Sequence, residues 1–184
     1  MSQGQDKERG ATLVEAAIAY SLLFLTLFAV VEFGLAFKDW LSVSHASRDG
    51  ARAGATFGND PSADILILRE VESTLAPIGL AVNDQVRIHE PGGSGTTYSY
   101  KPGSLSDCTN LPDCCDWTPC PEIGRDTYSP PNWLPADRDI SAPQTDRIAV
   151  SIRYSHNWVT GFFGSTTDFT TETDFQIEPQ VFDS

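Results

Sequence analysis

A single apolar segment near the N-terminus, residues 11–37, dominates this sequence. A helix of that length extends about 40 Å at about 1.5 Å per residue, and the hydrocarbon core of a bilayer is about 30 Å thick. The segment therefore predicts one membrane-spanning helix. About 147 residues follow Phe37, which is enough for one soluble domain of ordinary size.

Two glutamates interrupt the apolar segment, Glu15 near its start and Glu32 near its end. The uncharged residues between them reach only about 24 Å, so at least one carboxylate must lie at or just inside the hydrocarbon edge. An acidic side chain at the centre of a membrane helix costs about 2.5–3.5 kcal/mol, and less near the interface. Either both carboxylates simply reach the headgroup layer, or one of them has a specific partner, for which Glu15 is the stronger candidate.

The net charge of −13 is carried mainly by the residues after the apolar segment. An acidic domain argues against nucleic-acid binding, which requires clustered Lys and Arg side chains to neutralise phosphates. The acidity is compatible with a solvated exterior surface, but it predicts nothing about the fold.

The residues that precede Glu15 form a recognisable pattern of polar, glycine and apolar positions. A short polar stretch, residues 1–9, ends at Gly10, and four residues that begin with Ala11 separate this glycine from Glu15. This order resembles the leader and first turn of type IV pilins and their relatives. The resemblance implies cleavage after Gly10 by a prepilin peptidase at the cytoplasmic face of the membrane, with Gly10, Ala11 and Glu15 as the processing site.

Cleavage at this position would create a new ammonium group on Ala11. Glu15 lies four residues further along the same helix, one turn away. A carboxylate with a partner is tolerated in a low dielectric where a lone one is not. We therefore hypothesise that Glu15 pairs with the ammonium of its own chain or of a neighbouring subunit.

A second group of residues makes the resemblance more specific. Glu32-Phe33-Gly34 is followed by Arg48, Gly50, Ala51 and Arg52, as in the TadE-like family, although Ser47 replaces the usual alanine. Residues 147–179, which close with Glu178-Pro179, are similar to the end of TadE-like proteins. The resemblance implies a structural role in a tight-adherence (Flp-type) pilus, as a minor pilin or pseudopilin, with other pilin-like subunits contacting the N-terminal helix.

The helix is expected to continue beyond the membrane to about Phe57, with Trp40 at headgroup level. Small residues recur every four positions and form one stripe on this helix, against which another helix or a sheet could pack closely: Ser42, Ala46, Gly50, Gly54 and Gly58. Arg48 and Arg52 lie one turn apart. They could meet membrane phosphates, pair with Asp60 or Asp64, or face solvent.

The remaining sequence predicts an α+β domain. Asp60-Pro61 is typical of a helix start, and apolar spacing predicts a helix over residues 62–76. Alternation predicts a strand over residues 82–88 that returns over 96–100 after a glycine-rich turn, and a second antiparallel pair over 148–154 and 169–177. We divide the chain into a leader (1–10), a membrane helix with its extension (11–58) and an extracytoplasmic domain (59–184).

Residues 101–146 contain most of the chain's 12 prolines and all 4 cysteines, and we predict a long loop there. Disulfides would restrain it, with pairing of neighbouring Cys114 and Cys115 the least favoured of three connectivities: Cys108, Cys114, Cys115 and Cys120. A zinc site is the alternative, but no Cys-x-x-Cys and no nearby histidine support it. The cysteines and the acidity favour a C-terminal domain outside the cytoplasm.

No catalytic motif stands out. His45, His89 and His156 are far apart, and no phosphate loop, metalloprotease helix or nucleotide fingerprint occurs. We predict a structural protein without cofactor, metal or small-molecule substrate. The alternatives are an uncleaved, membrane-anchored binding or scaffold domain, and a secreted hydrolase cut at Gly34-Leu35-Ala36 as a signal peptide would be.

Overall fold

The structure, a computed structural model, describes residues 3–81, 84–100, 117–118 and 133–179. The predicted α+β fold is confirmed. In chain order its elements are α1 (Gln3–Phe57), α2 (Ala63–Leu75), β1 (Gln85–His89), β2 (Gly95–Tyr100), β3 (Trp117–Thr118), the 3-10 turn η2 (Pro135–Asp137), β4 (Arg147–Asn157) and β5 (Thr166–Gln176).

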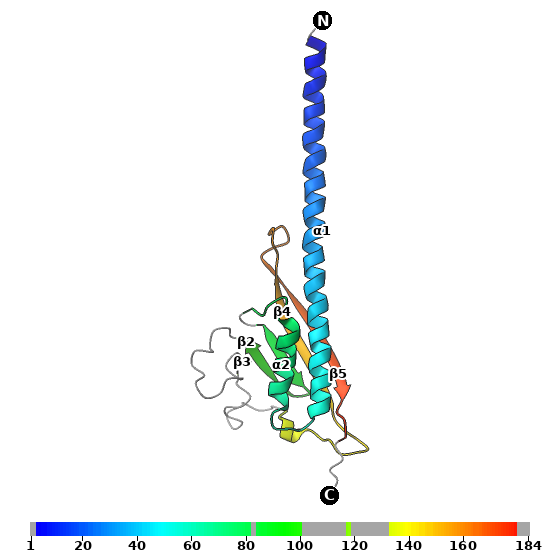
Figure 1. Ribbon diagram of the computed structural model, residues 1–184, viewed down its shortest axis with the longest axis vertical. Coiled ribbons are helices and arrows are strands. Elements are labelled where there is room, and N and C mark those ends of the chain that lie inside the picture. Colours follow the sequence, from blue (N-terminus) through cyan, green and yellow to red (C-terminus); the bar gives the residue numbers. More distant parts are fainter. Residues whose placement is uncertain (1–2, 82–83, 101–116, 119–132, 180–184) are drawn as a thin grey trace.

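Helix α1 is one continuous helix of 55 residues that ends at Phe57. The predicted extension of the helix beyond the apolar segment is confirmed. Its N-terminal half stands free, and its C-terminal half is packed against the rest of the chain (Figure 1). The helix ends where Gly58 adopts φ 52° and its N–H donates to the Gly54 carbonyl at 2.9 Å. Glycine reaches this left-handed conformation without a Cβ clash, so it terminates the helix at low cost.

The strands form one antiparallel sheet in the order β3-β2-β1-β4-β5. Both predicted strand pairs are present: β1 pairs with β2, and β4 pairs with β5 over their whole lengths. Along β4 the alternate residues facing the helices are all buried, which is the pattern of a sheet with one covered face: Ile148, Val150, Ile152, Tyr154 and His156.

The second half of α1 and the whole of α2 cover this face of the sheet (Figure 1). The stripe of small residues makes the approach possible. A Cβ on Gly50 would lie 2.8 Å from Val71 Cγ2 and 3.3 Å from Val150 Cγ1, and one on Gly54 would lie 2.7 Å from Ile148 Cδ1. The prediction that another element packs closely on this stripe is confirmed, and both α2 and β4 do so.

The start of α2 differs from the prediction. The helix begins at Ala63 with Ser62 as its N-cap, rather than at Ser62 after a capping Asp60. The Asp60 side chain accepts the N–H of Ser62 at 2.7 Å, which makes a local turn before the helix. Asp64, in the first helical turn, has a buried partner from elsewhere in the chain.

That partner is Arg138, which forms a buried ion pair with Asp64. Tyr98 also donates its hydroxyl to Asp64 at 2.6 Å, and Arg138 donates to the carbonyl of Gly58 at 3.1 Å. The guanidinium lies 4.8 Å from the ring centroid of Trp133. Removing one member of such a pair would leave a buried charge without compensation, so the pair fixes the end of α1, the start of α2 and strand β2 relative to one another.

The predicted loop over residues 101–146 is only partly described. Trp117–Thr118 forms the short edge strand β3 on β2, and Pro135–Asp137 forms a 3-10 turn, so regular elements occur where an irregular loop was predicted. The packing of Trp117 against Tyr100, with ring centroids 5.2 Å apart, accounts for this strand. All four cysteines lie outside the described residues.

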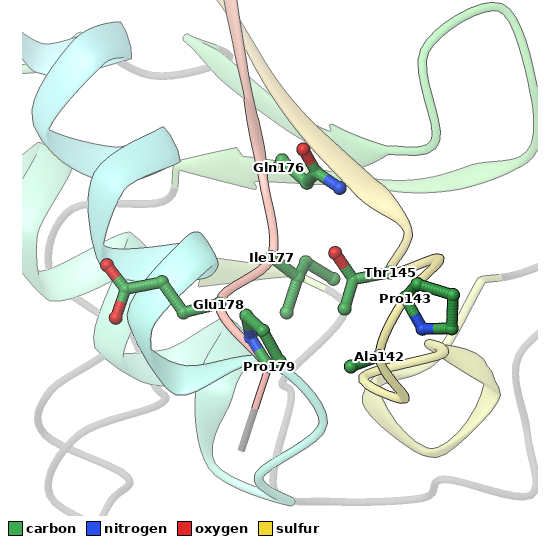
Figure 2. A pocket seen from close by; sticks show the side chains of 7 residues that line it. All are labelled: Ala142, Pro143, Thr145, Gln176, Ile177, Glu178 and Pro179. Carbon is green, nitrogen blue, oxygen red and sulfur yellow. The ribbon is translucent and has the colours of Figure 1, made fainter. Parts of the chain in front are cut away.

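The end of β5 is fastened to α1. The N–H of Ile177 donates to the carbonyl of Asp146 at 2.8 Å, and the N–H of Glu178 donates to that of Ala55 at 2.9 Å. Figure 2 shows Ile177 pointing toward Thr145, with Glu178 pointing away from that loop. A hollow of about 420 Å³ lies here, lined by Ala142, Pro143, Thr145, Gln176, Ile177, Glu178 and Pro179.

We predict that substitutions of Gly50 destabilise the domain whereas the same substitutions of Gly34 do not. Gly50→Val should lower the free energy of unfolding by about 1–3 kcal/mol because the side chain would overlap Val71 and Val150. Gly50→Ala should cost less. Thermal unfolding of the full-length protein in detergent, followed by near-ultraviolet circular dichroism, measures the difference.

Gly34 is the matched control because nothing lies within 4 Å of a Cβ built on it, in the same helix. Equal melting temperatures for Gly50→Val and Gly34→Val would contradict close packing on the stripe.

Candidate functional site: the helix–hairpin junction

Glu32 is the residue at which α1 changes from an isolated helix into part of the domain. It is 1% exposed, whereas the residues from Ala11 to Val31 are exposed or half-buried. Its carboxylate accepts the N–H of Val159 at 3.1 Å and the N–H of Thr160. Glu32 therefore has a specific partner, and the interpretation that it merely reaches the headgroup layer is not needed.

The partner is the turn that joins β4 to β5, residues 158–165, which we call the hairpin tip. It closes with a hydrogen bond from the N–H of Trp158 to the carbonyl of Ser165, at 3.1 Å. Gly161 and Gly164 adopt φ 72° and 105°, a region that favours glycine. The tight turn leaves the N–H groups of Val159 and Thr160 without strand partners, and the Glu32 carboxylate accepts them.

Aromatic rings surround this contact. The ring of Phe33 lies with its centroid 4.9 Å from that of Phe163 and 5.9 Å from that of Trp158. Beside them is an open apolar hollow of about 470 Å³, lined by Phe33, Ala36, Phe37, Trp40, Trp158 and Phe169. The junction is therefore a charged hydrogen-bond acceptor enclosed by apolar groups, in which each bond is stronger than it would be in water.

A second polar link lies one to two helical turns further along α1. His156 Nδ1 is 2.7 Å from Asp39 Oδ2, and both side chains are largely buried. The imidazole is stacked on Phe169 and meets the Trp158 ring edge-on. In the described part of the chain, His156 Nε2 has no hydrogen-bond partner.

Two further titratable groups lie in this region, Tyr154 on β4 and Asp84 just before β1. Burial raises the pKa of Tyr154 to about 12, with the negative charges of Asp39 and Asp84 adding to the effect. Burial also raises the pKa of Asp84, although the N–H groups of Ala81 and Ser155 donate to its carboxylate at 2.7 and 3.0 Å. The Asp84 carboxylate therefore joins the loop after α2 to strand β4.

The opposite face of the sheet carries exposed polar pairs along β4 and β5. Arg153 donates to Asp168 at 2.6 and 3.1 Å, and Ser155 donates to the same carboxylate at 2.7 Å. These bonds hold the pKa of Asp168 below its usual value, chiefly through Arg153. Exposed pairs of this kind contribute little to stability.

The predicted processing residues lie far from this junction. Gly10, Ala11 and Glu15 are all exposed on the free half of α1. Within the described residues, Glu15 makes no ion pair, and its pairing with a new N-terminal ammonium stays a prediction.

The predicted motif residues divide into two groups. Gly50 and Ala51 are buried in the domain core, whereas Gly34, Arg48 and Arg52 are exposed. Among the residues the structure describes, neither arginine forms an ion pair. The suggested partner Asp64 is bound by Arg138 instead, because the segment after η2 places that guanidinium beside it.

No local sequence pattern indicated which residues would meet at the junction. The contacts of Glu32 with the hairpin tip join residues 127 and 128 positions apart, and that of Asp39 with His156 joins residues 117 positions apart. The one available signal was a glutamate inside an apolar helix, which had to have a partner or reach water. Within the described ranges, no group of three or more His, Cys, Asp or Glu side chains could hold a metal ion.

Comparison with known proteins identifies the N-terminal region. Residues 10–52 match the model of a family described as TadE-like protein. This match shows that the N-terminal region of the chain is similar to TadE-like proteins. The match ends at residue 52, so the resemblance noted over residues 147–179 stays a prediction. Neither the comparison with curated proteins nor that with solved structures gave a match.

We predict that Glu32→Ala opens the hairpin tip. Losing hydrogen bonds to a charged acceptor costs about 1.5–3 kcal/mol, which corresponds to roughly ten- to hundredfold faster amide exchange. Hydrogen–deuterium exchange of the segment spanning residues 157–165, measured by mass spectrometry on the full-length protein in detergent, reports on the N–H groups of Val159 and Thr160.

Two variants serve as comparisons. Glu32→Gln keeps one oxygen acceptor and should exchange at an intermediate rate, while Glu15→Ala, at the other end of the free segment, should leave exchange unchanged. Wild-type protection of the tip in Glu32→Ala would show that the carboxylate does not hold it.

We predict that one tyrosine ionises with a pKa near 12 and that Tyr154→Phe removes this component. Because burial disfavours the tyrosinate, the folded chain keeps Tyr154 neutral; the associated stability is present below pH 10 and is lost as the pH rises through about 12. Absorbance at the tyrosinate band during an alkaline titration measures it. If Tyr154→Phe instead removes a component with the ordinary tyrosine pKa, the ring is not buried as described.

Proposed function

We propose that this protein is a membrane-held structural component of a tight-adherence pilus, a minor pilin or pseudopilin whose domain lies outside the cytoplasm. The proposal is carried by one observation: the helix that matches TadE-like proteins is free over its first half and joined rigidly to a domain over its second. A pilin-like subunit needs such a helix, because the free half contacts lipid or other helices while the other half carries the domain.

The free half has the length and character that this role requires. Helix α1 is long and apolar enough to cross a membrane, and its apolar window is not buried by the rest of the chain. The segment from Ala11 to Val31 extends roughly 32 Å, close to the hydrocarbon thickness of a bilayer of about 30 Å. Lipid contacts can be exchanged for contacts with other pilin-like helices because both surroundings are apolar.

The junction supports a role in assembly rather than simple anchoring. The contacts of Glu32 and Asp39 tie the hairpin to α1 immediately beyond the free segment. Any force or displacement applied to the helix would therefore reach the domain without a flexible linker between them.

The same contacts argue against secretion by cleavage near Ala36. Such a cut would remove Glu32 and separate Ala36, which is 6% exposed, from the domain that buries it. We therefore propose a structural protein rather than a secreted hydrolase. We also propose that a prepilin peptidase processes the chain after Gly10, as the resemblance to type IV pilins implies.

We predict that the native protein begins at Ala11. We also predict that a strain without this protein assembles no pili. Mass spectrometry of the intact protein from native membranes gives the N-terminus, and electron microscopy of a deletion strain gives the pili. Gly10→Leu should retain the leader, because the residue before the cut changes from the smallest side chain to a bulky one.

Glu15→Gln is the matched variant, since it should be processed yet fail to restore pili in the deletion strain. An intact Met1 start together with normal pili in the deletion strain would support the runner-up, an uncleaved membrane-anchored binding or scaffold domain.

A further inference from the structure

We propose that the hairpin tip is a second membrane contact, which lies in the boundary between headgroups and acyl chains of the leaflet where α1 leaves the bilayer. This inference rests on the proposed function only in requiring that α1 spans a membrane. The occupant of the exposed apolar surface is lipid, and the contact would fix how the domain stands on the membrane.

The first argument is the composition and exposure of the hairpin tip. Its eight residues include none of the chain's charged side chains, although the chain as a whole carries a charge of −13. Val159 is 75% exposed, Phe162 is 70% exposed and Phe163 is 47% exposed. Large apolar side chains that are this exposed and gathered on one turn indicate a contact with a membrane or another molecule.

The second argument is the axial position of the tip. Because Glu32 accepts the N–H groups of Val159 and Thr160, the tip is held beside the helix at the residue where the free segment ends. That segment already matches the hydrocarbon thickness of a bilayer. The tip is also the part of the β4–β5 hairpin that reaches farthest toward the N-terminal end of α1 (Figure 1).

The third argument is continuity with the spanning surface. Exposed apolar side chains run without a gap from the free segment into the turns beside the tip, where Phe33 is 55% and Phe37 is 59% exposed. The apolar hollow between Trp40 and Trp158 opens in the same region and could accept part of an acyl chain. Tryptophans concentrate at this depth of a membrane, because their rings combine an apolar body with a polar N–H.

The contact with Glu32 also lowers the cost of placing the tip there. Backbone N–H groups without partners are expensive in an apolar environment, and so is a carboxylate. The Glu32 carboxylate and the N–H groups of Val159 and Thr160 satisfy one another, so these polar groups are already paired when the tip meets lipid.

A fluorine probe tests the proposal in the full-length protein. Trifluoromethyl-phenylalanine is incorporated at Phe162, and each variant is reconstituted at one chain per phosphatidylcholine nanodisc. Relaxation of the fluorine signal is measured with a water-soluble gadolinium chelate and with lipids spin-labelled near the headgroup or near the chain end. The same probe at Phe24 marks the span, and at Gln144, exposed at the other end of β4, it marks water.

We expect the gadolinium effect at position 162 to be several-fold smaller than at 144, and the lipid label near the headgroup to act more strongly on 162 than the label at the chain end. The probe at 24 should be protected from gadolinium and respond to the deeper label. This pattern would place the tip in the interface.

Three other outcomes would overturn the proposal, and they differ in what else they affect. Gadolinium access at 162 equal to that at 144, with 24 protected, would place the tip in water while the span stands. Access at all three positions would refute the span and with it the proposed function. Protection of 162 only when several chains share one disc would mean that a second copy, and not lipid, covers the tip.

Discussion

The hydrogen bonds from the hairpin tip to the Glu32 carboxylate determine how this molecule is built. A carboxylate at this position of an apolar helix is costly unless it is solvated or paired. Here it accepts two backbone N–H groups that a tight turn has left without strand partners. One contact thus satisfies three polar groups at once, and it fixes the distance along α1 at which the domain begins.

Close packing of the helix on the sheet depends on a different property, the absence of side chains. At Gly50 and Gly54 there is no room for a Cβ, because side chains from α2 and β4 fill the space. Glycines cost about 1 kcal/mol each in a helix relative to alanine, so the burial they permit has to offset this cost. The first half of the helix is therefore apolar and long enough to cross a membrane, and the second half is part of the core of an α+β domain.

Buried polar pairs then fix the remaining elements. Arg138 and Asp64 join the end of α1 to the start of α2, while Asp39 and His156 join α1 to β4 next to the junction. Both pairs connect segments that are distant in the sequence and close in the fold. Such pairs add little net stability compared with apolar groups, but losing one partner is costly, which favours one arrangement of the elements over others.

The sequence by itself determined the elements whose signals are local. The apolar length of α1, its continuation to Phe57, the stripe of small residues and the two hairpins were all predicted, because hydrophobic periodicity depends on neighbouring residues. Strand β3 was missed, since two residues carry no periodicity, and the start of α2 was misplaced because a local turn competes with a cap.

Only the tertiary structure decided which residues meet: Glu32 with the hairpin tip, Asp39 with His156, and Asp64 with Arg138 rather than with Arg48 or Arg52. Those pairings depend on how the chain returns to α1 and α2 after more than 70 residues, and no local pattern records that path.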